Sequence, residues 1–203
     1  KSIMNFFIKH QEKYSRLELL ARTFFGLFYI GIPHLILISI LAIGVYFCQI
    51  ALFFIILFTG KYPKAIWDFL VNFYKYSIRI YSSLMNLCDG YPEFGLGGNH
   101  PNIELSVPYK EEVSRLRMLV RWLLGWLLLI PHIIILYLRA FIVFFIFIIA
   151  WFSVFFIGKY PKGMFIFVEG TWRWYMRIYS WIIFFVDEYP AFTGDILDTE
   201  NIN

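Results

Sequence analysis

The chain has 203 residues, of which 60% are hydrophobic, 22% are aromatic and only 16% are charged. An average soluble domain carries about 25% charged residues, and a soluble globule of this length could not bury so much apolar surface. The composition therefore excludes an ordinary soluble domain and predicts an integral membrane protein. The net charge of +4 is small and no nucleic-acid-binding motif accompanies it, so we expect membrane lipids, and no nucleic acid, as partners.

The sequence contains one unit twice. The string Gly-Lys-Tyr-Pro-Lys at residues 60–64 recurs at residues 158–162, and the offset of 98 holds to Phe94 and Phe192. Farther upstream, Ser15 matches Ser114 at an offset of 99, so the second copy lacks one residue. A duplication of this length predicts five segments. These are an N-terminal polar segment (1–14), a first membrane repeat (15–94), an extramembrane linker (95–113), a second membrane repeat (114–192) and an acidic tail (193–203).

Two short segments outside the repeats have the pattern of strands. In the linker Ile103, Leu105 and Val107 alternate with polar residues, which is typical of a half-exposed strand. Residues 6–8 hold the equivalent position before the first repeat. We therefore expect a small two-stranded pairing outside the membrane.

Each repeat opens with an amphipathic helix start and continues into a long apolar run. Ser15 and Glu18 have capping-box spacing, whereas the second copy keeps Ser114 but has Arg117 in place of the acid. The apolar runs cover residues 23–59 and 122–157. A helix of that length measures about 55 Å, whereas a hydrocarbon core is about 30 Å thick. Each run could cross once with a kink at Pro33 or Pro131, form a hairpin, or cross once and be followed by a second crossing after Lys64.

Charge placement favours the hairpin. Hairpins keep all but one of the 18 Lys and Arg residues on one side, and the exception, Arg139, falls at the expected hairpin tip. A single crossing divides the cations almost evenly. Under the positive-inside rule we expect a multi-pass protein of the inner membrane with both termini in the cytoplasm.

The segment after each Gly-Lys-Tyr-Pro-Lys string predicts an amphipathic helix at the membrane interface. One face carries polar residues such as Asp68, Lys75 and Arg79, or Glu169 and Arg177, and the other faces carry bulky aromatics. The alternative is a bundle helix whose charges face the protein interior. The expected contacts with lipid headgroups come from both copies: Lys61, Tyr62, Lys64, Arg79, Lys159, Tyr160, Lys162 and Arg177.

No pattern of residues predicts catalysis, a metal site or a cofactor. His34 and His132 are equivalent residues that each follow a proline inside an apolar run. Together with Arg139 they form a candidate polar site in the membrane, because ionisable groups there are often functional. The simpler interpretation is that each histidine pairs with a carbonyl freed by the proline, and that Arg139 extends to the membrane surface.

The elements Ile-Pro-His, Phe-Thr-Gly-Lys-Tyr-Pro-Lys, Arg-Ile-Tyr-Ser and Asp-x-Tyr-Pro-x-Phe resemble a bacterial membrane family known as domain of unknown function 4389. The resemblance covers residues 15–192 and implies a location in the bacterial envelope, without any activity. The fold we expect is an all-α integral membrane protein of two tandem repeats, each a membrane hairpin or kinked span followed by an interfacial helix. The function we expect is that of a non-enzymatic scaffold or accessory subunit that packs against other integral membrane proteins. Two alternatives are a small transporter or channel at the repeat interface, and a hairpin protein that induces membrane curvature.

Overall fold

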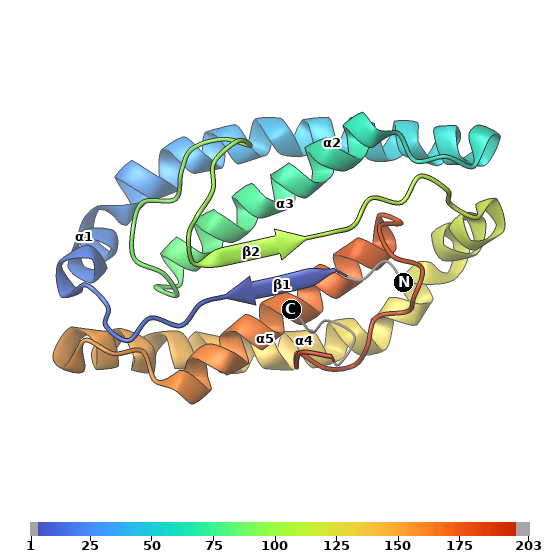
Figure 1. Cartoon of the computed structure of the whole chain (residues 1–203). Coiled ribbons are helices and arrows are strands. Elements are labelled where there is room, and N and C mark those ends of the chain that lie inside the picture. Colours follow the sequence, from blue (N-terminus) through green and yellow to red (C-terminus); the bar gives the residue numbers. More distant parts are fainter. Residues whose placement is uncertain (1–3, 198–203) are drawn as a thin grey trace.

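A computed structural model describes residues 4–197 of the chain (Figure 1). The fold is mostly helical. Its elements in chain order are β1 (Asn5–Ile8), α1 (Arg16–Gly26), the π-helical turn η1 (Leu27–Gly31), α2 (Ile32–Thr59), α3 (Lys64–Leu84), β2 (Ile103–Ser106), α4 (Arg115–Ile157) and α5 (Lys162–Ile182). Residues 198–203 of the expected acidic tail lie outside the described residues.

Each apolar run forms one continuous helix, so the expectation of a hairpin is wrong. The first helix extends without interruption over Arg16–Thr59, and the second extends over Arg115–Ile157, through Pro131. A hairpin inside lipid needs a turn whose backbone groups find other partners, and these runs contain no cluster of turn-forming residues to supply one. Gly60 and Gly158 end the two helices in the left-handed conformation, with φ of 71° and 74°, a conformation that suits glycine.

The residue that the second copy lacks is accommodated in η1. The first long helix has 44 residues and the second has 43. Between Arg22 and Pro33, where the repeat offset changes from 99 to 98, the Ile32 N–H bonds to the carbonyl of Leu27, five residues back. A π-helical turn holds one more residue than an α-helical turn. It therefore keeps both ends of the helix in register with its counterpart.

Helices α3 and α5 start at the proline of each Gly-Lys-Tyr-Pro-Lys string and pack back along the long helix of their own repeat. On their other side they contact the strands, α3 with β2 and α5 with β1. Figure 1 shows the resulting order of layers, with the strands in front, α3 and α5 behind them, and the long helices at the two edges. One side of the molecule is therefore formed by strands and loops, and the long helices border it along both edges (Figure 1).

The expected strand pairing is confirmed. β1 and β2 pair antiparallel, with Phe6 opposite Leu105 and Ile8 opposite Ile103. Because β1 belongs to the N-terminal segment and β2 to the linker, the segment that precedes each repeat contributes one strand to a shared ribbon at the centre of the molecule (Figure 1). The fold is thus all-α apart from this ribbon.

The two repeats are also joined at both ends of the long helices. The Tyr14 N–H donates to the Gly158 carbonyl, and the Val113 N–H donates to the Gly60 carbonyl, each at 2.9 Å. Arg16 and Arg115 likewise donate to the last turn of the opposite long helix, at the Phe156 and Phe58 carbonyls. Each long helix therefore starts where the other ends. The repeats are related by an approximate two-fold axis through the ribbon, as Figure 1 shows.

Candidate functional site

The long helices expose most of their apolar circumference. α2 buries only four of its 28 residues and α4 buries ten of its 43. The buried residues form one narrow stripe that faces the rest of the protein. Large apolar side chains on the remaining faces are exposed, among them Ile36, Ile40, Ile43, Phe47, Trp126, Ile133, Leu138 and Phe144. A soluble protein rarely leaves so large an apolar surface uncovered.

The four lysines of the Gly-Lys-Tyr-Pro-Lys turns are exposed at the two ends of the molecule. Lys61 pairs with Glu111 at 2.8 Å, and Lys64 pairs with Asp68. Lys159 and Lys162 are exposed as well. All four lysine side chains are accessible from outside the protein. Their contact with lipid headgroups stays a prediction.

The two tyrosines of these turns lie inside the protein, so the expectation that they sit among headgroups is wrong. Tyr62 is fully buried against the rings of Trp67 and Phe185, and Tyr160 packs against Tyr14 and Phe165. Each tyrosine fills the space that the turn creates between the end of a long helix and the start of the next helix. Their role in the structure is to pack the turn.

Arg79 and Arg177 are also buried, which corrects their placement on an interfacial face. Arg79 is 3% exposed and donates to the backbone carbonyls of Glu93, Gly95 and Gly98. Arg177 is 6% exposed and donates to the carbonyls of Thr193 and Asp195. Burying a cation is costly unless it is hydrogen-bonded, and here the chain that follows each Tyr-Pro pair supplies carbonyls to the terminal guanidinium nitrogens, while the Arg79 Nε has no partner among the described residues. For Arg79 and Arg177 the alternative of charges that face the interior is therefore the correct one, whereas Asp68 of the same stripe is exposed.

The remaining charges of the α5 stripe hold the ribbon. Arg173 pairs with Glu169 at 2.7 Å, with both side chains buried. The Glu169 carboxylate also accepts from the Ile8 N–H, and Arg173 donates to the Phe6 carbonyl. Burial raises the pKa of Glu169, while the Ile8 N–H and the Arg173 charge oppose that rise. This i,i+4 pair of α5 is therefore buried, and it binds the backbone of β1 at Phe6 and Ile8.

In each repeat an acidic residue just before the second Tyr-Pro anchors that loop to the first turns of the long helix. Asp89 accepts from the Ser15 N–H at 2.8 Å and lies 3.5 Å from Arg22, which also pairs with Glu18. Asp187 pairs with Arg117 at 2.8 Å, with Arg121 at 3.6 Å, and with Lys110. The expectation from the sequence that Asp187 belongs to a solvated acidic tail is wrong, as these ion pairs show. The signal for the anchoring role was the identity of Asp89 and Asp187, and of Arg22 and Arg121, in the two repeats.

The two histidines do not pair with carbonyls freed by the prolines. His34 lies between two tyrosine hydroxyls, 2.7 Å from Tyr76 and 2.9 Å from Tyr91. It is Tyr91 that donates to the Tyr29 carbonyl, which lies four residues before Pro33 and so lacks its usual N–H partner. The carbonyl freed by Pro33 therefore does have a side-chain partner, as the simpler interpretation expected, but that partner is Tyr91 and not His34.

His132 has a different environment. Its Nδ1 accepts from the Trp174 indole at 2.9 Å, and its ring stacks on Phe192 with centroids 3.9 Å apart. Each histidine thus contacts the helix and loop of its own repeat. No hydrogen bond or ring contact between the described residues joins His34 to His132.

Arg139 lies in the middle of the continuous helix α4 and not at a hairpin tip, and its side chain is half-buried. It packs on α5, where it donates to the Thr171 hydroxyl at 3.0 Å and to the Phe167 carbonyl at 3.1 Å. Its guanidinium also lies 4.1 Å from the centre of the Phe167 ring. Arg139 and His132 share one neighbour, since the guanidinium lies 5.7 Å from the centre of the Trp174 ring whose indole donates to His132. His34 lies apart from both, between Tyr76 and Tyr91.

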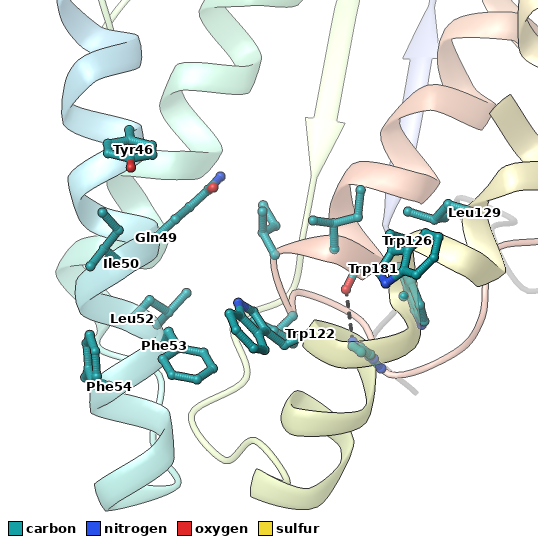
Figure 2. A pocket seen from close by; sticks show the side chains of 15 residues that line it. Tyr46, Gln49, Ile50, Leu52, Phe53, Phe54, Trp122, Trp126, Leu129 and Trp181 are labelled. Atoms are coloured by element: carbon teal, nitrogen blue, oxygen red, sulfur yellow. Dashed lines mark hydrogen bonds between the residues drawn. The ribbon is translucent and has the colours of Figure 1, made fainter.

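A groove of about 650 Å³ opens between the end of α2 and the start of α4, and the sequence analysis did not predict it. One wall is formed by Tyr46, Gln49 and Phe53 of α2, and the other by Trp122 and Trp126 of α4 (Figure 2). Trp181 and the residues that follow α5 close its floor. The signal that it left in the sequence is a set of tryptophans without counterparts in the first repeat, since Thr23 and Ser83 replace Trp122 and Trp181 there.

The described part of the chain offers no metal-binding cluster, because no three His, Cys, Asp or Glu side chains among residues 4–197 come together in a suitable arrangement. The two cysteines, Cys48 and Cys88, are both free thiols. Burial raises the pKa of Cys88 to about 12, which leaves it unreactive at neutral pH. The remaining candidates for a functional site are the exposed apolar faces of the long helices and the groove.

The fold and these surfaces define a helical tandem-repeat protein with two long apolar helices. The family model described as "Domain of unknown function (DUF4389)" matches residues 18–95 and 115–194. The chain belongs to this family, with one family domain in each repeat. Comparisons with curated proteins and with solved structures gave no match.

Proposed function

We propose that this protein is embedded in a membrane and serves there as a non-enzymatic scaffold or accessory subunit for other integral membrane proteins. The observation that carries the proposal is the exposure of the long helices. In their most apolar windows only 17% and 11% of the residues are buried. The core helix of a soluble protein is mostly buried, whereas a helix in lipid needs protein contacts on one face only.

We further propose that both long helices lie along one leaflet instead of crossing the bilayer. Their apolar runs, at about 55 Å, exceed the hydrocarbon thickness of about 30 Å. Because the helices are antiparallel, a crossing would send one lysine-bearing turn to each side, which runs against the positive-inside rule. A position in the membrane plane keeps both turns and the ribbon at the same surface. The cytoplasmic face of the bacterial inner membrane suits these cations, since its lipids are anionic.

Accessibility of single cysteines tests this placement. Cys48 and Cys88 are first replaced by alanine, and cysteine is then introduced at Lys61 or Lys159, which are exposed at opposite ends of the molecule. A third variant at the exposed residue Glu104 of β2 reports the side of the ribbon. A membrane-impermeant thiol reagent should label all three from the cytoplasm only. Labelling of Lys61→Cys and Lys159→Cys from opposite sides would mean that the helices cross.

Copurification tests the scaffold role. Extraction in a mild detergent followed by native electrophoresis should show the chain in a larger assembly, whose other components mass spectrometry identifies. Migration as a single chain would remove the scaffold role and leave the placement in the membrane unaffected.

The proposed placement of both long helices in one leaflet also favours membrane bending as a second candidate function. Two long apolar helices inserted in one leaflet would enlarge that leaflet more than the other. The purified protein should then convert large vesicles into tubules or small vesicles in proportion to the amount bound. Binding that leaves vesicle size unchanged in electron micrographs would exclude this function.

A further inference from the structure

The groove between α2 and α4 breaks the symmetry of the two repeats. At the other end of the molecule, where α1 meets the end of α4, the residues equivalent to Phe53 and Trp122 are Trp151 and Thr23. The Trp151 indole donates to the Thr23 hydroxyl at 2.8 Å and joins the two helices directly. At the groove the equivalent residues make a ring contact without a hydrogen bond, with the centroids of Phe53 and Trp122 5.2 Å apart.

The floor of the groove departs from the first repeat in the same way. After α3 the chain has Asn86 in the left-handed conformation, where its side chain accepts from Arg22. The equivalent residue after α5 is Phe184, also left-handed with φ of 64°, and it lines the groove. Asparagine tolerates this conformation, whereas a bulky side chain there is strained. Such strain tends to persist where a local surface is needed for binding.

The walls and the polar groups of the groove identify the class of ligand. The lining is almost entirely aliphatic and aromatic, and the volume lies within the range of ligand pockets, about 300–1,000 Å³. Gln49 supplies an amide on this apolar wall, and its side chain points toward the gap between the helices (Figure 2). Arg121 also lines the groove, close to Arg117, Lys110 and their shared partner Asp187.

Together these features suit an amphiphile with an apolar chain and polar groups at one end. The groove is continuous with the exposed apolar faces of α2 and α4, so a molecule in the surrounding lipid could enter it sideways. We propose that the groove holds an acyl chain of one membrane phospholipid as a resident ligand. This inference rests on the proposed placement of the long helices in lipid.

Native mass spectrometry with a matched pair of variants tests the proposal. Gln49→Trp adds a large side chain at an exposed position of the groove wall, and Phe147→Trp places the same side chain at the equivalent position of the second repeat, which does not line the groove. The protein is incubated with phosphatidylglycerol in mild detergent and then washed free of loose lipid. We expect one lipid per chain in the wild type and in Phe147→Trp, and at least a tenfold lower occupancy in Gln49→Trp. Equal occupancy in the two variants would overturn the proposal, as would a dimeric mass in place of a bound lipid.

Fluorescence quenching gives a second measurement that does not depend on a bulky substitution. Trp181 is 4% exposed and lies at the floor of the groove, whereas Trp174 is 3% exposed on the same helix and does not line it. In a Trp122→Phe/Trp126→Phe background, vesicles of phosphatidylcholine with brominated chains should quench a component of the emission. Trp181→Phe should reduce the quenched component, part of which comes from the half-buried Trp151 on α4, and Trp174→Phe should leave it unchanged. Quenching that is unaffected by Trp181→Phe would contradict a chain in the groove.

The two proposals fail separately. If alkaline carbonate releases the protein from membranes, the placement in lipid is wrong. If the protein stays embedded but retains no lipid in the groove, only the acyl-chain proposal is wrong.

Discussion

Asp89 and Asp187 occupy the same position in the two repeats and each lies near an equivalent arginine, yet a second neighbouring side chain has opposite charge in the two repeats. Near Asp89 the third residue after the helix cap is Glu18, whereas near Asp187 the equivalent residue is Arg117. Burial raises the pKa of Asp89, and the Glu18 charge adds to that rise. Burial acts the same way on Asp187, but Lys110, Arg117 and Arg121 together hold its pKa below the ordinary value. The two acids therefore contribute to stability with opposite dependence on pH.

Replacement of these acids by asparagine should reveal the difference. Because the folded-state pKa of Asp187 is lowered, its contribution is present above the unfolded-state pKa of about 3.9 and is lost as the pH falls through the folded-state value. Asp187→Asn should therefore cost about 1–3 kcal/mol at pH 7 and less as the solution is acidified. For Asp89 the sign is reversed, because its folded-state pKa is raised and its ionisation opposes folding. Asp89→Asn should therefore cost less stability at pH 7 than at acidic pH, where the carboxyl is protonated. Thermal unfolding in detergent across this pH range measures both, and identical profiles would contradict the assignment.

Arg79 and Arg177 should be required for folding. Each satisfies two or more backbone carbonyls, and loss of such a buried donor leaves groups that cost about 1–3 kcal/mol each. We expect Arg79→Glu/Arg177→Glu to accumulate as misfolded or degraded protein, and the single lysine variants to melt at lower temperature. Gel filtration in detergent and thermal melts measure this outcome.

Lys159→Glu/Lys162→Glu is the matched control for those charge reversals. Both lysines are exposed, so the fold should persist. Binding to anionic vesicles, measured by flotation, should instead weaken by about 1 kcal/mol for each lysine that faces the lipid. Normal folding of the arginine double variant, with the same loss of flotation, would restore the arginines to the membrane interface.

The two repeats should reassemble when supplied as separate chains. Each half brings one strand of the ribbon and one Gly-Lys-Tyr-Pro-Lys turn that bonds to the other half. Co-expression of residues 1–100 and 101–203, with an affinity tag on one half, should recover both in about equal amounts. Recovery of the tagged half alone, in soluble and correctly sized form, would show that a repeat folds independently.

Glycine substitutions should separate backbone conformation from packing. At Gly60 and Gly158 the left-handed conformation disfavours any side chain, so alanine at either site should cost roughly 1–2 kcal/mol. At Gly163 in the first turn of α5, an added Cβ meets no atom within 4 Å, so Gly163→Ala should raise the stability by up to about 1 kcal/mol. Thermal melts of the three single variants provide the comparison.

The sequence repeat and the hydrophobic periodicity predicted which segments are helices and strands, but not what the polar face of each helix contacts. The strand pairing followed from alternation at Ile103 and Leu105, and the ends of the long helices followed from Gly60 and Gly158. The polar stripe containing Arg79 predicted an amphipathic helix, but a stripe can face water, headgroups or buried carbonyls with the same spacing. The loop after Tyr91 supplies those carbonyls, and its position is a long-range property that no local pattern encodes.

The groove could not be predicted for a related reason. Its walls come from α2 and α4, which are distant in sequence, and its width depends on how closely two long helices approach. The absence of a Trp151–Thr23 type of bond at Phe53 and Trp122 becomes meaningful only once the ends of the helices are known to meet.

The π-helical turn η1 has a consequence for the mutational tolerance of the long helices. Successive residues of an α-helix are about 100° apart, so one deletion in the middle of α4 would rotate Arg121 away from Asp187 or His132 away from Trp174. In η1 the same deletion would convert the π-turn into a regular helical turn and leave Arg22 and His34 facing their partners. The first long helix can therefore lose one residue in η1 and keep its register, whereas the second long helix has no π-helical turn in which a deletion would be tolerated. Insertions and deletions that persist in the long helix should therefore gather between Arg22 and Pro33, on the side of the molecule opposite the groove.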